Sequence, residues 1–295
     1  MATRRFTIRP QGAFSLRESA LFGFGQRTDD SFDGVMRLAF CLDGGYLEQV
    51  GVEVRQDNAG VHGIVHGDGD LERVQGQVAR VLSLDHDGRQ YDAVGHRDPV
   101  VRRLQLAAPG LRPPLFYSPY EAAAWSIISA RRPAGQMARV RQHLSESAGR
   151  VFELAGKRLA ALPTPRRLLE LGAFAGLTPE KTQRLQGVAR AALGGQLEAA
   201  RLLALGPDEA SVDLQKLKGI GGFYAGLITM RGTGFTDILP AEEPRAMALI
   251  RELYGLPVAP SAQHLAEISE PWRPFRTWVT VLIRAAAHRL PAAVA

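Results

Sequence analysis

One segment decides the fold of this chain: Leu217-Lys218-Gly219-Ile220-Gly221-Gly222-Phe223-Tyr224-Ala225, which lies between two stretches of helical character. Two glycines flank an aliphatic residue here, and glycines permit a tight turn and a close approach of the backbone to another molecule. The helix that follows presents free N–H groups and the positive end of its dipole to an anion. The segment therefore predicts a hairpin of two helices that can hold a DNA phosphate without reading base sequence. The alternative is an ordinary glycine-rich connection between helices.

Helical signals surround this segment on both sides. Three Ser/Thr–Pro pairs are typical of a helix N-cap followed by a first-turn proline: Ser118-Pro119, Thr164-Pro165 and Thr178-Pro179. Apolar spacing predicts helices over 120–128, 134–149, 164–171, 179–194, 196–204, 207–217, 243–254, 261–267 and 272–289. We find no convincing strand alternation after residue 115, so this part is predicted to be all-helical.

The first hundred residues have a different pattern. Alternating or β-branched runs predict strands at Phe6–Pro10, Met36–Asp43, Tyr46–Asp57 and Val61–Gly67. Asp43-Gly44-Gly45 and Asn58-Ala59-Gly60 are turn signals between them, and 70–84 has helical spacing. We therefore expect an α+β domain with an antiparallel sheet over 1–108. An all-helical domain follows over 109–295, with two lobes, 115–238 and 239–295, and a cleft for DNA between them.

Charge and cysteine content restrict the function classes. Residues 1–100 hold 11 Lys/Arg and 15 Asp/Glu, whereas residues 101–295 hold 25 and 15, for a total net charge of +6. A basic second part favours a polyanion partner, although charge that serves only solubility is the alternative. The single cysteine, Cys41, excludes a disulfide framework and a four-cysteine iron–sulfur cluster. No apolar run is long enough to span a bilayer, and we expect a cytoplasmic protein without a membrane partner.

The wider pattern around the hairpin resembles the helix-hairpin-helix DNA glycosylase superfamily, in particular its 3-methyladenine DNA glycosylase II (AlkA) branch. The resemblance rests on L-x-G-I-G-x-x-x-A, then Met230-Arg231-Gly232, then Leu239-Pro240 with an acidic pair. Pro109–Pro113, Leu162–Pro165, Gly176–Lys181 and Trp272–Trp278 also resemble segments of that branch. The similarity covers roughly residues 105–295.

This resemblance implies a fold, an activity and partners. The N-terminal α+β domain would be TATA-binding-protein-like. The protein would be a monofunctional glycosylase of base-excision repair, which flips a damaged base out of double-stranded DNA and hydrolyses its N-glycosidic bond. An N-alkylated purine would be the substrate, with deaminated bases such as hypoxanthine or uracil as a variant. A damaged-DNA binding protein without catalysis is the competing hypothesis. The resemblance implies no cofactor, no obligate protein partner and a monomer.

The catalytic carboxylate of the family is an Asp two residues after a proline that follows the hairpin. By this matching Glu242 takes the catalytic position, and Glu243 is its neighbour. Glutamate is longer by one methylene, and a misplacement of ~1 Å at a reacting centre costs roughly a hundredfold in rate. The alternative for either residue is an acid that caps a helix.

The matching also gives a base pocket made of Phe223, Leu227, Trp125 and Arg284. Phe223 stands where bifunctional members have a lysine nucleophile, so no Schiff base can form there, and its ring would stack on the flipped base. Leu227 and Arg284 stand where the branch has a tyrosine and a tryptophan. Arg284 would disfavour a cationic purine and can donate to a carbonyl of a neutral base; alternatively it points to solvent or pairs with Glu242 or Glu243.

The same matching predicts the DNA contacts. Gly219, Gly221, Gly222 and Lys218 would contact the backbone. Arg131 would fill the gap left by the flipped base, next to Arg132; a solvated pair at a helix end is the alternative. No metal site is certain, and a monovalent cation at the main chain of Leu217 and Ile220 is the one suggested by the family.

Overall fold

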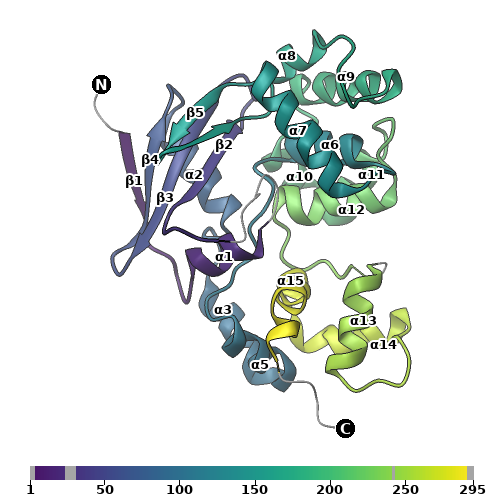
Figure 1. Ribbon diagram of the computed structural model, residues 1–295. Coiled ribbons are helices and arrows are strands. Elements are labelled where there is room, and N and C mark those ends of the chain that lie inside the picture. The colour runs from purple at the N-terminus through teal and green to yellow at the C-terminus, as the bar shows by residue number, and fades with distance from the viewer. Residues whose placement is uncertain (1–3, 24–30, 241–242, 291–295) are drawn as a thin grey trace.

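The computed structural model describes residues 4–23, 31–240 and 243–290. An antiparallel sheet lies beside two groups of helices, one above the other in Figure 1. Its strands are β1 (Arg4–Ile8), β2 (Met36–Cys41), β3 (Gln49–Asp57) and β4 (Gly60–His66), in the order β1-β4-β3-β2. These strands lie where the sequence alternation predicted them, and both predicted turns connect neighbouring strands, so the antiparallel sheet is confirmed.

Two helices bury the apolar face of the sheet. On α2 (Leu71–Val81) the residues Val74 and Val78 are fully buried against strand residues, and Asp70 caps its N-terminus. This helix was predicted. The sequence analysis did not identify α1 (Leu16–Phe22), whose seven residues are too few for a clear periodicity; Ser15 caps its N-terminus, and Leu16 reaches the same core.

The upper group of helices packs around α6, most of whose residues are buried. All three Ser/Thr–Pro pairs begin helices as predicted, with the hydroxyl of each N-cap residue accepting a backbone N–H. The group consists of α6 (Pro119–Ser129), α7 (Ala134–Ala148), α8 (Pro165–Leu169), α9 (Pro179–Leu193), α10 (Ala199–Leu205), α11 (Pro207–Leu214), α12 (Gly222–Ile228) and the π-helix η1 (Thr229–Thr233).

The prediction that residues 109–295 are all-helical is wrong. A hairpin of β5 (Val151–Leu154) and β6 (Lys157–Ala160) follows α7, and four-residue strands are too short to give a recognisable alternation. Phe152 and Leu154 pack with Ala39 of the large sheet. A Cβ on Gly51 of β3 would lie 2.8 Å from Phe152 Cγ, so this glycine makes room for the hairpin.

The lower group combines helices from both ends of the chain. Val101 and Leu104 share one hydrophobic core with Trp272 and Trp278. The boundary at residue 108 stays a prediction, and residues 88–107 pack with the C-terminal helices rather than with the sheet core. The elements are α3 (Gly88–Asp92), α4 (Val94–Arg97), α5 (Pro99–Ala107), α13 (Pro244–Leu253), α14 (Ala262–Ser269), α15 (Arg276–Ala286) and the short 3-10 helices η2 (Glu270–Trp272) and η3 (Ala287–Arg289). Within the described ranges, no helix has the length and apolar character needed to cross a membrane.

Candidate active-site pocket

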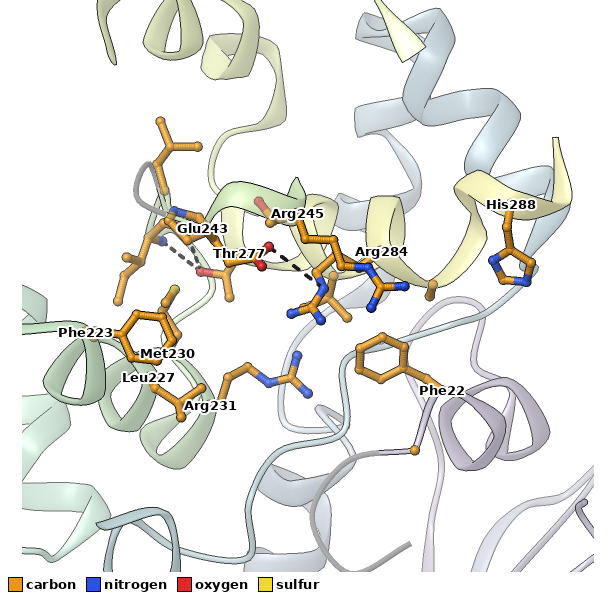
Figure 2. Close-up of a pocket in the computed structure, with 18 of the residues that line it drawn as sticks. Phe22, Phe223, Leu227, Met230, Arg231, Glu243, Arg245, Thr277, Arg284 and His288 are labelled. Atoms are coloured by element: carbon orange, nitrogen blue, oxygen red, sulfur yellow. Dashed lines mark hydrogen bonds and ion pairs between the residues drawn. The ribbon is translucent and has the colours of Figure 1, made fainter. Parts of the chain in front are cut away.

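A cavity of about 930 Å³ opens where the two groups of helices meet the end of α1. Figure 2 shows that side chains from the hairpin helix, the segment before α13, α15 and α1 converge on it. The described lining residues are Leu21, Phe22, Gly23, Gly222, Phe223, Gly226, Leu227, Met230, Arg231, Ile238, Leu239, Pro240, Glu243, Arg245, Thr277, Thr280, Val281, Arg284, Ala285, His288 and Arg289.

The hairpin forms as predicted between α11 and α12. Gly219 has a φ of +95°, and a Cβ there would lie 2.8 Å from Arg184 Cδ and 3.0 Å from Ile127 Cδ1, so both backbone and space require a glycine. Gly221 precedes the first residue of α12 in an extended conformation with open space around it. The main chain of the turn is therefore accessible, as is the exposed Lys218; their DNA contacts stay predictions.

Most of the predicted base-pocket residues come together in this cavity. Phe223, Leu227 and Arg284 line it, and the Phe223 ring is 61% exposed while touching Tyr224 edge-on at 5.3 Å between centroids. The structure does not bring Trp125 into the lining: its half-buried side chain packs against the core of the upper group. The ring therefore serves helix packing in this structure.

The acidic residue of the described pocket lining, Glu243, comes from the segment that follows η1 in the chain. Pro240 and Glu243 line the cavity, whereas Glu242, the predicted catalytic residue, lies outside the described residues. Glu243 caps α13, because its Oε2 accepts the Ala246 N–H at 2.8 Å. The same Oε2 lies 3.9 Å from Arg284 Nε. For Glu243, both alternatives, the helix cap and the ion pair with Arg284, are thus present.

Arg231 and Phe22 are among the pocket residues that were not identified from the sequence. Arg231 is 6% exposed, and its guanidinium lies 5.5 Å from the centre of the Phe22 ring. Burial and the nearby Arg284 cation lower the pKa of Arg231 to about 9. The sequence offered Met230-Arg231-Gly232 only as part of a family pattern. Phe22 comes from a distant segment, and no local signal could have placed it here.

The predicted wedge residues lie on the loop between α6 and α7. Arg131 and Arg132 are exposed, and Arg131 has a φ of +57°, a conformation that L residues adopt at a cost of roughly 1–3 kcal/mol. Lys181 of α9 holds the loop, since its Nζ donates to the carbonyls of Ile128 at 2.6 Å and Ala130 at 3.0 Å. The arginines are thus presented from a tethered loop, and their insertion into DNA stays a prediction.

The carbonyls suggested for a monovalent cation lie in the hairpin turn. The Leu217 carbonyl accepts the Ile220 N–H at 3.0 Å, and a carbonyl oxygen has a second lone pair. The turn is therefore compatible with a cation, which stays a prediction. Within the described part of the chain, no group of three or more His, Cys, Asp or Glu residues could hold a metal ion.

Known DNA glycosylases are similar in sequence to this chain. No family model matches the chain. A DNA-3-methyladenine glycosylase of Bacillus subtilis is 23% identical over 213 residues, which cover 71% of this chain and 70% of that protein. A probable bifunctional transcriptional activator/DNA repair enzyme AlkA of Mycobacterium tuberculosis is 28% identical over 214 residues, 72% of this chain but 42% of that one.

The fold is shared with solved structures. The structure of a 3-methyladenine DNA-glycosylase from Archaeoglobus fulgidus matches with a TM-score of 0.77 at 22% identity and covers 97% of this chain and 98% of its own. The match includes the sheet as well as the helices. The chain is therefore similar in sequence to DNA glycosylases of the 3-methyladenine and AlkA type, and it shares the fold of the Archaeoglobus fulgidus enzyme.

Proposed function

We propose that this protein is a monofunctional DNA glycosylase that receives a flipped damaged base in the pocket beside the hairpin. One observation carries the proposal: the open Phe223 ring, the hairpin helix, Pro240 and Glu243 border a single cavity of about 930 Å³. Cavities of roughly 300–1,000 Å³ are typical of small-ligand sites. A base can be attacked only after it leaves the stack, and an exposed aromatic face gives it a surface to stack on.

Glu242 is the proposed catalytic carboxylate. Loss of the base builds positive charge on the sugar, which a nearby carboxylate stabilises while it orients the attacking water. The proposal is supported by its neighbours, because Pro240 and Glu243 line the cavity. The Glu243 carboxylate already caps α13 and lies near Arg284, which makes it the weaker candidate.

The monofunctional character follows from the nucleophile position. Phe223 stands where a lyase needs a lysine, and no lysine lines the described part of the pocket. Without an amine no Schiff base forms with the sugar, so the expected product is an intact abasic strand. We further propose that the protein acts as a monomer on duplex DNA, without a cofactor or an obligate protein partner.

The names of the relatives favour an N-alkylated purine as the base. A second candidate, a deaminated base such as hypoxanthine or uracil, is supported by one observation. Arg284 lines the pocket, where the family matching expects a tryptophan, and a guanidinium favours a carbonyl acceptor over a cationic ring.

The DNA contacts are proposed to come from the hairpin turn and from the loop between α6 and α7. The hairpin would contact the phosphates through the main chain at Gly219, Gly221 and Gly222 and through Lys218. Arg131 would enter the gap left by the flipped base, with Arg132 beside it. The exposure of these residues and the anchoring of their loop by Lys181 support this assignment.

A base-release assay with Glu242→Gln tests the proposal. Duplexes carrying a methylated purine, hypoxanthine or uracil are incubated with the protein, and abasic sites are revealed by alkali. We expect release of at least one base and a loss of roughly a hundredfold or more in the variant. Glu252→Gln, an exposed acid of the following helix α13, is the matched control.

Two outcomes would contradict this function. Equal turnover by Glu242→Gln and the wild type would remove Glu242 from the mechanism. Tight binding of lesion duplexes without release of any base by the wild-type protein would favour the damaged-DNA binding protein on the same fold.

A further inference from the structure

The loop between α6 and α7 presents Arg131 from a strained turn. After the last helical residue, Ser129, Ala130 has φ −51° and ψ 125°, and Arg131 has φ +57°. The Arg132 N–H closes the turn by donating to the Ser129 carbonyl at 3.2 Å. These features are typical of a type II turn, which favours glycine at its third residue. An arginine there costs free energy, and such strain persists only where surrounding contacts hold it.

Lys181 of α9 makes contacts that hold this turn. Its Nζ donates to the carbonyls of Ile128 at 2.6 Å and Ala130 at 3.0 Å. The last carbonyls of a helix have no partner within the helix, so the ammonium satisfies two acceptors at the C-terminal end of α6. The Ala130 carbonyl belongs to the peptide unit that joins Ala130 to Arg131. Its orientation therefore restricts the backbone of Arg131 directly.

The position of Lys181 in its own helix is electrostatically unfavourable. The Thr178 hydroxyl accepts the Lys181 N–H at 3.3 Å and caps α9, so the lysine lies in the first turn, near the positive end of the dipole. Partial burial, with the cations Arg132 and Arg184 nearby, lowers the pKa of Lys181. The C-terminal end of α6 offers a negative dipole end and two carbonyls. Lys181 is thus stabilised by α6 and its turn rather than by α9.

The same end of α9 also contacts the hairpin. α9 packs against α6 in the upper group of helices (Figure 1). A Cβ on Gly219 would lie 2.8 Å from Arg184 Cδ, so the hairpin turn packs closely on that side chain. Lys181 and Arg184 are three residues apart and lie on one face of the helix. The first turns of α9 therefore join the two loops that are proposed to contact DNA.

We propose that Lys181 is a positioning residue for base flipping, which holds Arg131 at a fixed place relative to the hairpin so that its side chain enters the gap left by the flipped base. This inference rests on the proposed function, since it concerns the same DNA complex. Lys181 acts through Arg131 and touches neither the base nor the sugar. Rigid presentation reduces the freedom that is lost on binding, and a misplacement of ~1 Å costs roughly a hundredfold in rate.

A double-mutant cycle with Arg131→Ala tests this coupling. The quantity compared is kcat/KM for release of a methylated purine from duplex DNA. We expect Lys181→Met alone to lower it roughly tenfold to a hundredfold. In the Arg131→Ala background the same change should have almost no further effect, because the side chain that Lys181 positions is gone. Arg190→Met, at an exposed position in the last turn of α9, is the matched control.

A second measurement does not depend on base release. Fluorescence anisotropy gives the Kd for a duplex and for a single strand that each carry tetrahydrofuran, an analogue of an abasic site. Only the duplex has a gap between stacked bases, so Lys181→Met should weaken binding of the duplex roughly tenfold and hardly change binding of the single strand. Loss of folded protein would weaken both alike, and circular dichroism and thermal melting check that the fold persists.

The strain in the turn is tested separately. Glycine adopts a positive φ without the steric cost that alanine pays. Arg131→Gly should therefore unfold at a higher temperature than Arg131→Ala, while both variants lose activity on duplex DNA to a similar extent. A lower unfolding temperature for Arg131→Gly would contradict the strained turn on which the role of Lys181 depends.

The outcomes separate this inference from the function on which it rests. Equal losses from Lys181→Met in both backgrounds would show a direct DNA contact or a purely structural effect. That result, or equal weakening of duplex and single-strand binding, overturns the positioning role while base release by the wild type stands. Release of no base by the wild type overturns the proposed function instead. The anisotropy measurements, repeated in the Arg131→Ala background, then still test whether Lys181 acts through Arg131.

Discussion

Phe223 and Phe22 present two aromatic rings to one pocket, but their surroundings differ. Phe22 carries the Arg231 guanidinium on its face, whereas Phe223 is 61% exposed and meets Tyr224 edge-on. At the scale of single residues, this difference favours Phe223 over Phe22 as the proposed surface for stacking on the base. It leaves Phe22 to orient a charge.

We therefore expect Phe223→Ala to lower kcat/KM for base release by about tenfold to a hundredfold, because stacking on an aromatic side chain contributes roughly 1–3 kcal/mol per base. The midpoint of chemical unfolding should hardly change, since the ring is largely in solvent. Phe223→Tyr keeps the aromatic face and should retain activity. Equal losses in both variants would argue against stacking.

Single residues also show how much of the pocket could be predicted from the sequence. Phe223, Leu227 and Arg284 were placed by matching the sequence to the family pattern, and all three line the pocket. Trp125 was assigned to the pocket, yet its ring packs in the helical core. Arg231 lines the pocket from the π-helical η1, and no local pattern in the sequence indicates that element.

At the scale of elements, α6 and α7 are joined by a buried ion pair between Glu121 and Arg141. Glu121 is 0% exposed and its Oε2 accepts from Arg141 Nη2 at 2.7 Å. Oε1 accepts the Cys41 N–H at 3.4 Å, which connects the pair to β2. Burial outweighs these partners and raises the pKa of Glu121 to about 7.

This shift predicts how stability depends on pH. The pKa of Glu121 is higher in the folded protein than its usual 4.5, so folding takes up a proton between the two values. The stabilisation is complete below about pH 4.5. The contribution declines as pH rises through about 7. Between pH 5 and 8, the free energy of unfolding of the wild type should fall relative to Glu121→Gln, measured by urea denaturation. A constant difference, or a relative gain by the wild type, would contradict the shift.

Some helices and strands can be recognised from the sequence, and others cannot. The long strands β3 and β4 and the proline-capped helices α6 and α9 carry periodicity or caps, and their residues lie as predicted. The β5–β6 hairpin is stable only because Phe152 and Leu154 pack on the large sheet. The short α3 and α4 depend in the same way on packing with distant helices, so their local sequence is uninformative.

At the scale of the whole molecule, Asp98 connects the first third of the chain to the last. This 5% exposed carboxylate caps α5, with Oδ1 accepting the N–H groups of Val100 at 2.8 Å and Val101 at 3.1 Å. Its Oδ2 accepts from Tyr254 Oη at 2.5 Å and Trp272 Nε1 at 2.8 Å. The helices joined here include α15, which forms one wall of the pocket.

Asp98→Ala should therefore destabilise the molecule by about 4–7 kcal/mol. It removes an N-cap, which contributes about 1 kcal/mol, and the acceptor of two polar groups, for which a hydrogen bond to a charged partner contributes about 1.5–3 kcal/mol. Tyr254→Phe, which removes one of these bonds, should cost about 1.5–3 kcal/mol. The measurement is urea unfolding, followed by tryptophan fluorescence and by circular dichroism.

Because helices from both ends of the chain share this core, the two probes should report one transition in the wild type. Asp68→Ala is the control: its side chain is 93% exposed, and a surface change of this kind shifts stability by at most ~0.5 kcal/mol. A loss below ~1 kcal/mol in Asp98→Ala would contradict the stabilising role of its hydrogen bonds. Separate transitions in the wild type would mean that the helices from the two ends of the chain do not unfold as one unit.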